Sequence, residues 1–133
     1  MIILSPTASA QSFYTRCRSH SENKYLFVLS NALSGVQVYV QDLTYSDGII
    51  SGNIDLPLSA DDGRERLLRI FSVDSTNETI IEIESNGGES YSSETWTDTL
   101  DTLTANGGIE KEIYRGLCFI TSQTDLDKYS MYG

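Results

Sequence analysis

The chain is poor in the residues that most catalytic and metal sites need. Its 133 residues contain one histidine, two cysteines, two prolines and one tryptophan. With a single imidazole and no Cys-x-x-Cys spacing, the ligand pattern of the usual zinc site is missing. The one histidine, His20, lies in a polar turn, and nothing in the sequence indicates a Ser-His-Asp arrangement around it. The sequence also has no phosphate-binding glycine loop, dinucleotide fingerprint or nucleophile elbow. We therefore expect His20 to be a surface residue, and the protein to be neither an enzyme nor a cofactor carrier.

Positive charge is also scarce. Nine Lys and Arg stand against nineteen Asp and Glu, a formal net charge of −10 that disfavours nucleic-acid phosphates and anionic lipid headgroups as partners. No basic residue occurs between Arg69 and Lys111, a stretch that is rich in acids. A solvated face is the simplest interpretation, and neutralisation by cations or docking on a basic partner are the others. A structural Ca²⁺ on residues 74–84 stays open, although the glycine and spacing of an EF-hand are missing.

Long hydrophobic runs and a disulfide framework are absent as well. No stretch approaches the ~18 consecutive apolar residues of a membrane span, and the N-terminus has no basic region typical of a signal peptide. The length suits one domain, residues 1–133, whose core needs no covalent staple. We therefore expect Cys17 and Cys118 to be unpaired.

What the chain does contain is a series of short β-type segments separated by Gly, Asn, Asp and Pro. Residues 25–29 are almost wholly apolar and predict a central strand, whereas residues 36–43 alternate, with Val36, Val38 and Val40 on one side. Further strands are expected at 2–4, 13–18, 49–56, 67–73 and 79–84, the last with Ile81 and Ile83 facing inward. This spacing predicts an all-β fold, a single antiparallel β-sandwich (Ig-like or jelly-roll-like) of about seven to nine short strands.

Two segments stand outside that pattern. Residues 85–108 are polar and acidic and are expected to be a long insertion. Within it, Trp96, Leu100 and Leu103 have helical spacing, but alternating threonines over 95–101 also fit a strand, which we favour without excluding the helix. Residues 122–133 are expected to form a C-terminal arm.

Two groups of residues are candidates for binding a partner. Arg64, Arg66 and Arg69 form a basic cluster, which either pairs with Asp61, Asp62 and Glu65 or docks on an acidic neighbouring subunit. On the arm, exposed aromatic side chains commonly dock on partners, and a frayed end is the other interpretation. The candidate arm residues are Tyr129, Met131 and Tyr132. The eight tyrosines of the chain also fit an assembly component, because tyrosine is enriched at protein interfaces.

The end of the chain, Ile113-Tyr-Arg-Gly-Leu-Cys-Phe-Ile-Thr-Ser-Gln123 followed by Tyr129-Ser130, predicts a hairpin that turns at Arg115-Gly116. Together with residues 13–18, 25–31 and 67–73, this segment resembles a group of small structural proteins of tailed bacteriophages, including crAss-like phages. The resemblance implies a β-sandwich of the virion, without catalytic residues, that is assembled in the host bacterial cytoplasm.

Within a virion, we expect a small head accessory or decoration protein that docks on the major capsid protein and stabilises the shell. Edge strands and tyrosine-bearing loops would make the contacts, and many copies would make modest contacts additive. A neck or tail adaptor ring is the nearest alternative, and a homo-oligomer is compatible with both. The alternative from another class is a carbohydrate-binding module that uses Trp96.

Overall fold

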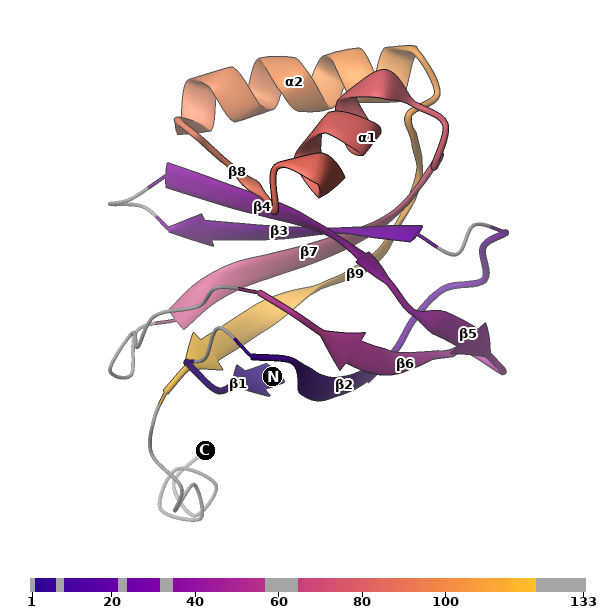
Figure 1. Cartoon of the computed structure of the whole chain (residues 1–133), viewed down its shortest axis with the longest axis vertical. Coiled ribbons are helices and arrows are strands. Elements are labelled where there is room, and N and C mark those ends of the chain that lie inside the picture. Colours follow the sequence, from indigo (N-terminus) through magenta and orange to yellow (C-terminus); the bar gives the residue numbers. More distant parts are fainter. Residues whose placement is uncertain (1, 7–8, 22–23, 32–34, 57–64, 122–133) are drawn as a thin grey trace.

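The computed structural model describes residues 2–6, 9–21, 24–31, 35–56 and 65–121 (Figure 1). Strands account for 54% and helices for 20% of the described residues, so this part of the chain is mostly β, as the sequence predicts. Two helices nevertheless form where strands were expected. In chain order the elements are β1 (Ile2–Leu4), β2 (Gln11–Arg16), β3 (Lys24–Asn31), β4 (Gly35–Asp42), β5 (Thr44–Ser46), β6 (Ile49–Ile54), β7 (Glu65–Val73), α1 (Glu78–Ser85), β8 (Glu89–Tyr91), α2 (Ser93–Ala105) and β9 (Ile109–Ile120).

The strands form two sheets that are connected through the chain at one side. The larger sheet has six strands in the order β1-β9-β7-β3-β4-β8, and the smaller has three in the order β2-β6-β5. All neighbouring strands are antiparallel except β1 and β9, which are parallel. Only Leu43 separates β4 from β5, so the chain passes directly from the large sheet into the small one. At the other side β1 and β2, each the outer strand of its sheet, lie near each other without pairing (Figure 1).

The large sheet carries a hydrophobic core on both of its faces. On β3, Tyr25 and Phe27 pack towards the small sheet, whereas Leu26 and Val28 pack towards the helices. A strand buried on both faces needs an almost continuous apolar sequence, which explains why residues 25–29 read as a central strand. The alternation of β4 is confirmed in the same way, because its valines face the helices while Tyr39 faces the small sheet.

Residues 78–85 form helix α1, so the predicted strand over 79–84 is wrong. Asn77 caps the helix, its Oδ1 accepting hydrogen bonds from the backbone N–H of Thr79 (3.0 Å) and of Ile80 (3.3 Å). Ile80 and Ile83, three residues apart, are buried, whereas Ile81 is 47% exposed. The period is therefore helical, and Ile81 points outward instead of inward.

Residues 93–105 form helix α2, so the strand favoured there is also wrong. Ser92 caps the helix by accepting from the backbone N–H of Thr95 at 3.1 Å. Trp96 and Leu103 are buried against the large sheet, as the helical spacing allowed. The threonines tolerate the helix because their hydroxyls donate to carbonyl oxygens four residues earlier, for example Thr99 to Thr95 at 2.9 Å.

The predicted hairpin at Arg115-Gly116 is wrong as well, because β9 runs through both residues as one strand. β9 pairs antiparallel with β7, with Arg115 opposite Arg69 and Gly116 opposite Leu68. A Cβ at position 116 would come within 2.5 Å of the hydroxyl oxygen of Tyr114, so the glycine allows a close approach of that side chain. Residues 113–120 therefore belong to one 12-residue strand, which stands between β1 and β7 in the large sheet.

Candidate functional site

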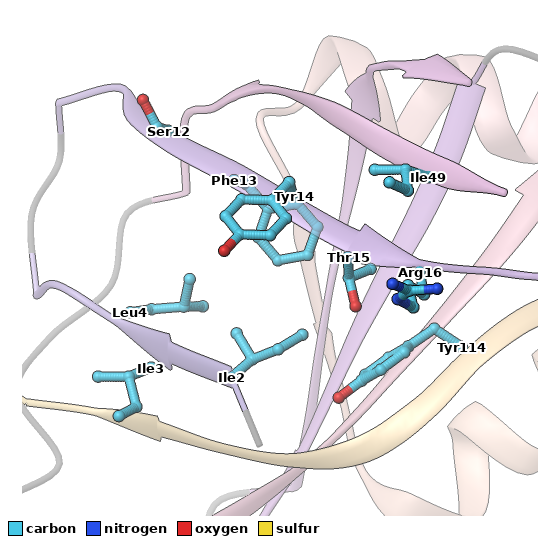
Figure 2. A pocket seen from close by; sticks show the side chains of 10 residues that line it. All are labelled: Ile2, Ile3, Leu4, Ser12, Phe13, Tyr14, Thr15, Arg16, Ile49 and Tyr114. Carbon is cyan, nitrogen blue, oxygen red and sulfur yellow. The ribbon is translucent and has the colours of Figure 1, made fainter. Parts of the chain in front are cut away.

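An open groove lies between β1 and β2, the outer strands of the two sheets (Figure 2). Its volume is about 650 Å³. The lining comes from all of β1, residues 12–16 of β2, Ile49 at the start of β6, and Tyr114 of β9. None of these lining residues is acidic, and none is a histidine or cysteine.

The floor of the groove is part of the hydrophobic core. Leu4 and Phe13 are buried, and the ring of Phe13 packs edge-on against Phe27 with centroids 5.2 Å apart. Ile2 packs against the same core. At the rim, Tyr14 is 77% exposed, which leaves a large aromatic ring in solvent. The core therefore holds the apolar floor in place, and the partly buried Ile2 and Tyr114 leave apolar surface open to the groove.

The walls of the groove are strand edges. Among the described residues, β1 pairs only with β9 and β2 only with β6, so the outer edge of each has no strand partner. Such edges present backbone N–H and C=O groups that can pair with an added strand.

The side chain of Gln11 closes one end of the groove. Its Oε1 accepts from the backbone N–H of Ser5 and its Nε2 donates to the backbone carbonyl of Ser5, both at 2.9 Å. The side-chain amide of Gln11 therefore makes the same two hydrogen bonds with Ser5 that a peptide group of a paired strand would make. The end nearer Arg16 and Tyr114 has no such bridge in the described part of the chain (Figure 2).

That open end is rich in arginine. A second hollow of about 360 Å³ shares Arg16 and Tyr114 with the groove and extends to Arg18 and Arg115. Within the described ranges, Arg16 and Arg18 are exposed and have no ion-pair partner. Three arginines at one end of a groove make a local basic site on a chain of net charge −10.

Glu112 neutralises part of this basic site. Its carboxylate pairs with Nε of Arg69 at 2.6 Å and with Nε of Arg115 at 3.0 Å. Burial raises the pKa of Glu112, but hydrogen bonds from Arg115 and Arg69 outweigh it and the net direction is downward. Glu112 therefore stays ionised and leaves Arg16 and Arg18 as the uncompensated charges.

Of the five predicted partner-binding residues, only Arg66 lies within the described part of the chain. Arg64, Tyr129, Met131 and Tyr132 lie outside the described residues. Arg66 is half-buried on β7, does not line the groove, and donates to Oε1 of Gln37 at 3.4 Å. Arg69, three residues further along β7, pairs with Glu112, and its guanidinium lies 4.8 Å from the centroid of the Phe71 ring; the side chains of Asp61, Asp62 and Glu65 lie outside the described part of the chain.

Trp96 is not available as a sugar platform. Its side chain is 5% exposed and packs on Tyr91 with ring centroids 5.6 Å apart. A carbohydrate-binding aromatic must offer a ring face to solvent, so the burial of Trp96 speaks against the alternative of a carbohydrate-binding module that uses this residue.

A separate polar cluster surrounds His20, which is half-buried instead of lying at the surface. Its Nε2 lies 3.2 Å from the hydroxyl of Tyr25, and its ring packs on Tyr45 with centroids 4.5 Å apart. Nearby, the carboxylate of Glu110 accepts hydrogen bonds from Ser21 and from the buried Ser72. The hydrogen bond from Ser21 is the main reason that the pKa of Glu110 is lowered.

Across the residues that the structure describes, no group of three or more His, Cys, Asp and Glu side chains could hold a metal ion. Cys17 and Cys118 do not form a disulfide.

Comparison with known proteins adds no assignment: no family model, curated protein or solved structure matches the chain. Within the described ranges, neither helix has the length and apolar character needed to cross a membrane. The groove could not be predicted from the sequence alone. The sequence predicts a strand at 2–4, but nothing local shows that β2 lies opposite its edge.

Proposed function

We propose that this protein is a non-enzymatic structural component of a tailed-phage virion that docks on neighbouring subunits through the β1–β2 groove. The observation that supports this is the pair of unpartnered strand edges facing each other across an apolar floor. Main-chain hydrogen bonds to an edge supply affinity, and pockets for alternate side chains supply specificity.

Within the virion, we favour a small head accessory or decoration protein that binds the major capsid protein and stabilises the shell. Many copies on one particle would make individually modest contacts additive. A ring-forming neck or tail adaptor remains the alternative, because the same groove can join copies to each other. Assembly would take place in the host bacterial cytoplasm.

The domain description belongs to this proposal. We describe the chain as one sandwich-like domain over 1–133, with residues 85–108 as the insertion and residues 122–133 as the arm. α2, inside the insertion, buries Trp96 and Leu103 against the large sheet. The insertion therefore covers one face of the domain and leaves the groove, on the other side of the large sheet, for contacts.

The test is localisation of the protein on intact virions of the source phage by immunogold labelling. Label spread over the head supports a head accessory protein, whereas label at one vertex or along the tail supports the neck or tail alternative. Absence of label from both intact and disrupted particles refutes the virion assignment.

A matched pair of variants tests the groove itself. Tyr14→Lys places a charge on the exposed rim of β2, and Ile81→Lys places the same charge on the exposed face of α1. We expect Tyr14→Lys to be lost from particles and Ile81→Lys to be retained. Equal incorporation of the two variants would show that the groove is not the docking surface.

A further inference from the structure

We infer that the groove binds residues 126–132 of a second copy of this chain as an added β-strand. The inference rests on the proposed function, because it takes the groove as the docking surface, and the second copy it names is the neighbouring subunit of the ring-forming alternative. Three observations support the inference: the edges of β1 and β2 that have no strand partner among the described residues, the length and chemistry of residues 126–132, and the end of the groove at which a segment can enter.

The geometry calls for an extended segment. One added strand would pair with β1 on one side and β2 on the other, and would join the two sheets where they are open. Gln11 already makes this type of contact at one end, since its amide donates to and accepts from the backbone of Ser5. A peptide continuing from that position would repeat the same pairing along the groove.

The arm has the length that the groove requires. β2 has six residues, which at ~3.3 Å per residue span about 20 Å. The seven residues 126–132 span about 23 Å in the same conformation. Residues 122–125 remain as a connection that can reach about 13 Å from the end of its own domain.

The arm also has complementary chemistry. In a strand, Tyr129 and Met131 point to the same face, and Ile2 and Tyr114, which line the groove and are only partly buried, offer apolar contact to both. Asp125 and Asp127 precede them in the sequence, and Lys128 lies between Asp127 and Tyr129. The two acids lie on the same face of the strand as Tyr129 and Met131, so they meet the hollow lined by Arg16, Arg18 and Arg115 if the segment enters at the open end and runs towards Gln11. In that direction the added strand is antiparallel to the six-residue β2 and parallel to the three-residue β1, so the more stable type of pairing falls on the longer edge.

The donor is a second copy because of where the chain leaves its own domain. The backbone N–H of Thr121 donates to the carbonyl of Leu4 at 3.1 Å, beside the end that Gln11 and Ser5 close. An arm of the same chain would have to enter at this closed end, with its acids far from Arg16. The arm of another copy can enter at the open end, and such head-to-tail contacts generate rings or chains of copies.

Sedimentation equilibrium of the full-length chain tests the association. We expect concentration-dependent oligomers, and Tyr14→Lys or Ile3→Lys should weaken association about tenfold or more by charging a strand edge. Ile81→Lys is the matched control, because Ile3 and Ile81 have similar exposure, 42% and 47%. An excess of synthetic peptide 122–133 should dissociate the oligomers, and a scrambled peptide should not. A chain that stays monomeric, or oligomers that tolerate the edge lysines as well as Ile81→Lys, would overturn the inference.

Photo-crosslinking identifies the donor. A light chain with Tyr132→p-benzoylphenylalanine is mixed with unsubstituted heavy-isotope chain, and crosslinked peptides are mapped by mass spectrometry. We expect light-to-heavy crosslinks on β1 or β2; crosslinks confined to one chain, or on α1 and α2, would refute the assignment. Both tests use purified protein without particles. A failure here together with label on virions would leave the proposed function intact, whereas unlabelled virions would refute that function separately.

Discussion

Asn77 connects the beginning of α1 with the end of α2 through a single side chain. Its Oδ1 caps α1 by accepting from two backbone N–H groups, and its Nδ2 donates to Oδ1 of Asn106, the C-cap residue of α2, at 3.2 Å. Replacement of this residue therefore removes a helix cap and a contact between two helix ends at once.

The expected cost of Asn77→Ala follows from these two contacts. Loss of an N-cap typically costs about 1 kcal/mol. The hydrogen bond to Asn106 adds about 1 kcal/mol. The acceptor on Asn106 is not left unsatisfied, because it also accepts from the backbone N–H of Gly108 at 3.0 Å. We therefore expect the free energy of unfolding to fall by about 2 kcal/mol.

Asn77→Asp separates the two contributions. A carboxylate keeps the cap and interacts favourably with the N-terminus of the helix, but it cannot donate to Asn106. We expect this variant to lose about 1 kcal/mol or less.

The assay is urea unfolding followed by the fluorescence of Trp96, the single tryptophan, which is buried beneath α2. The midpoint should shift while the slope stays constant, because neither variant changes the surface exposed on unfolding. A wild-type midpoint for Asn77→Ala, or equal losses in the two variants, would refute the reasoning.

Three further predictions concern pH, backbone geometry and thiol chemistry. The pKa of Glu110 is lowered in the folded state, so its contribution to stability is complete above the ordinary pKa of 4.5 and is lost as pH falls through the folded pKa. The wild-type protein should therefore lose more stability on acidification than Glu110→Gln. The measurement is the midpoint of urea unfolding as a function of pH. A Cβ on Gly35 (φ +85°) would lie 2.5 Å from a backbone carbonyl oxygen, whereas one on Gly87 (φ +71°) would meet nothing within 4 Å. Thermal unfolding should show a loss of about 1 kcal/mol for Gly87→Ala and several times more for Gly35→Ala, and equal losses would contradict this. Cys118 is fully buried, and burial raises the pKa of Cys17. In the native protein, a thiol reagent should therefore not label Cys118 and should label Cys17 slowly. In denaturant both cysteines should react without reductant, and a need for prior reduction would reveal a disulfide.

Several strands could be predicted because their burial is written into local sequence. Residues 25–29 are apolar on both faces, and the valines of residues 36–40 alternate with polar or aromatic neighbours, so each pattern fits one environment. The edge strand at Ile2–Leu4 could also be predicted, since Ser5-Pro6 follows it directly and proline cannot continue a ladder.

The two helices could not be predicted with the same certainty because their sequences satisfy two periods. In residues 79–84, Ile81 and Ile83 fit a strand, while Ile80 and Ile83 fit a helix. Packing on the large sheet favours the second pair, and caps at Asn77 and Ser92 satisfy backbone N–H groups at both helix starts.

The sequence by itself determined the β-rich composition, the positions of the central strands and the acidic surface, because these depend on the order of apolar and polar residues along the chain. Only the tertiary structure decided that Arg115 and Gly116 lie within β9, since pairing with β7 along the strand overrides a local turn signal. It also decided the groove, because the edges of β1 and β2 become neighbours only after both sheets have formed. A contact between residues distant in sequence is fixed by the packing of whole layers, and no local pattern encodes it.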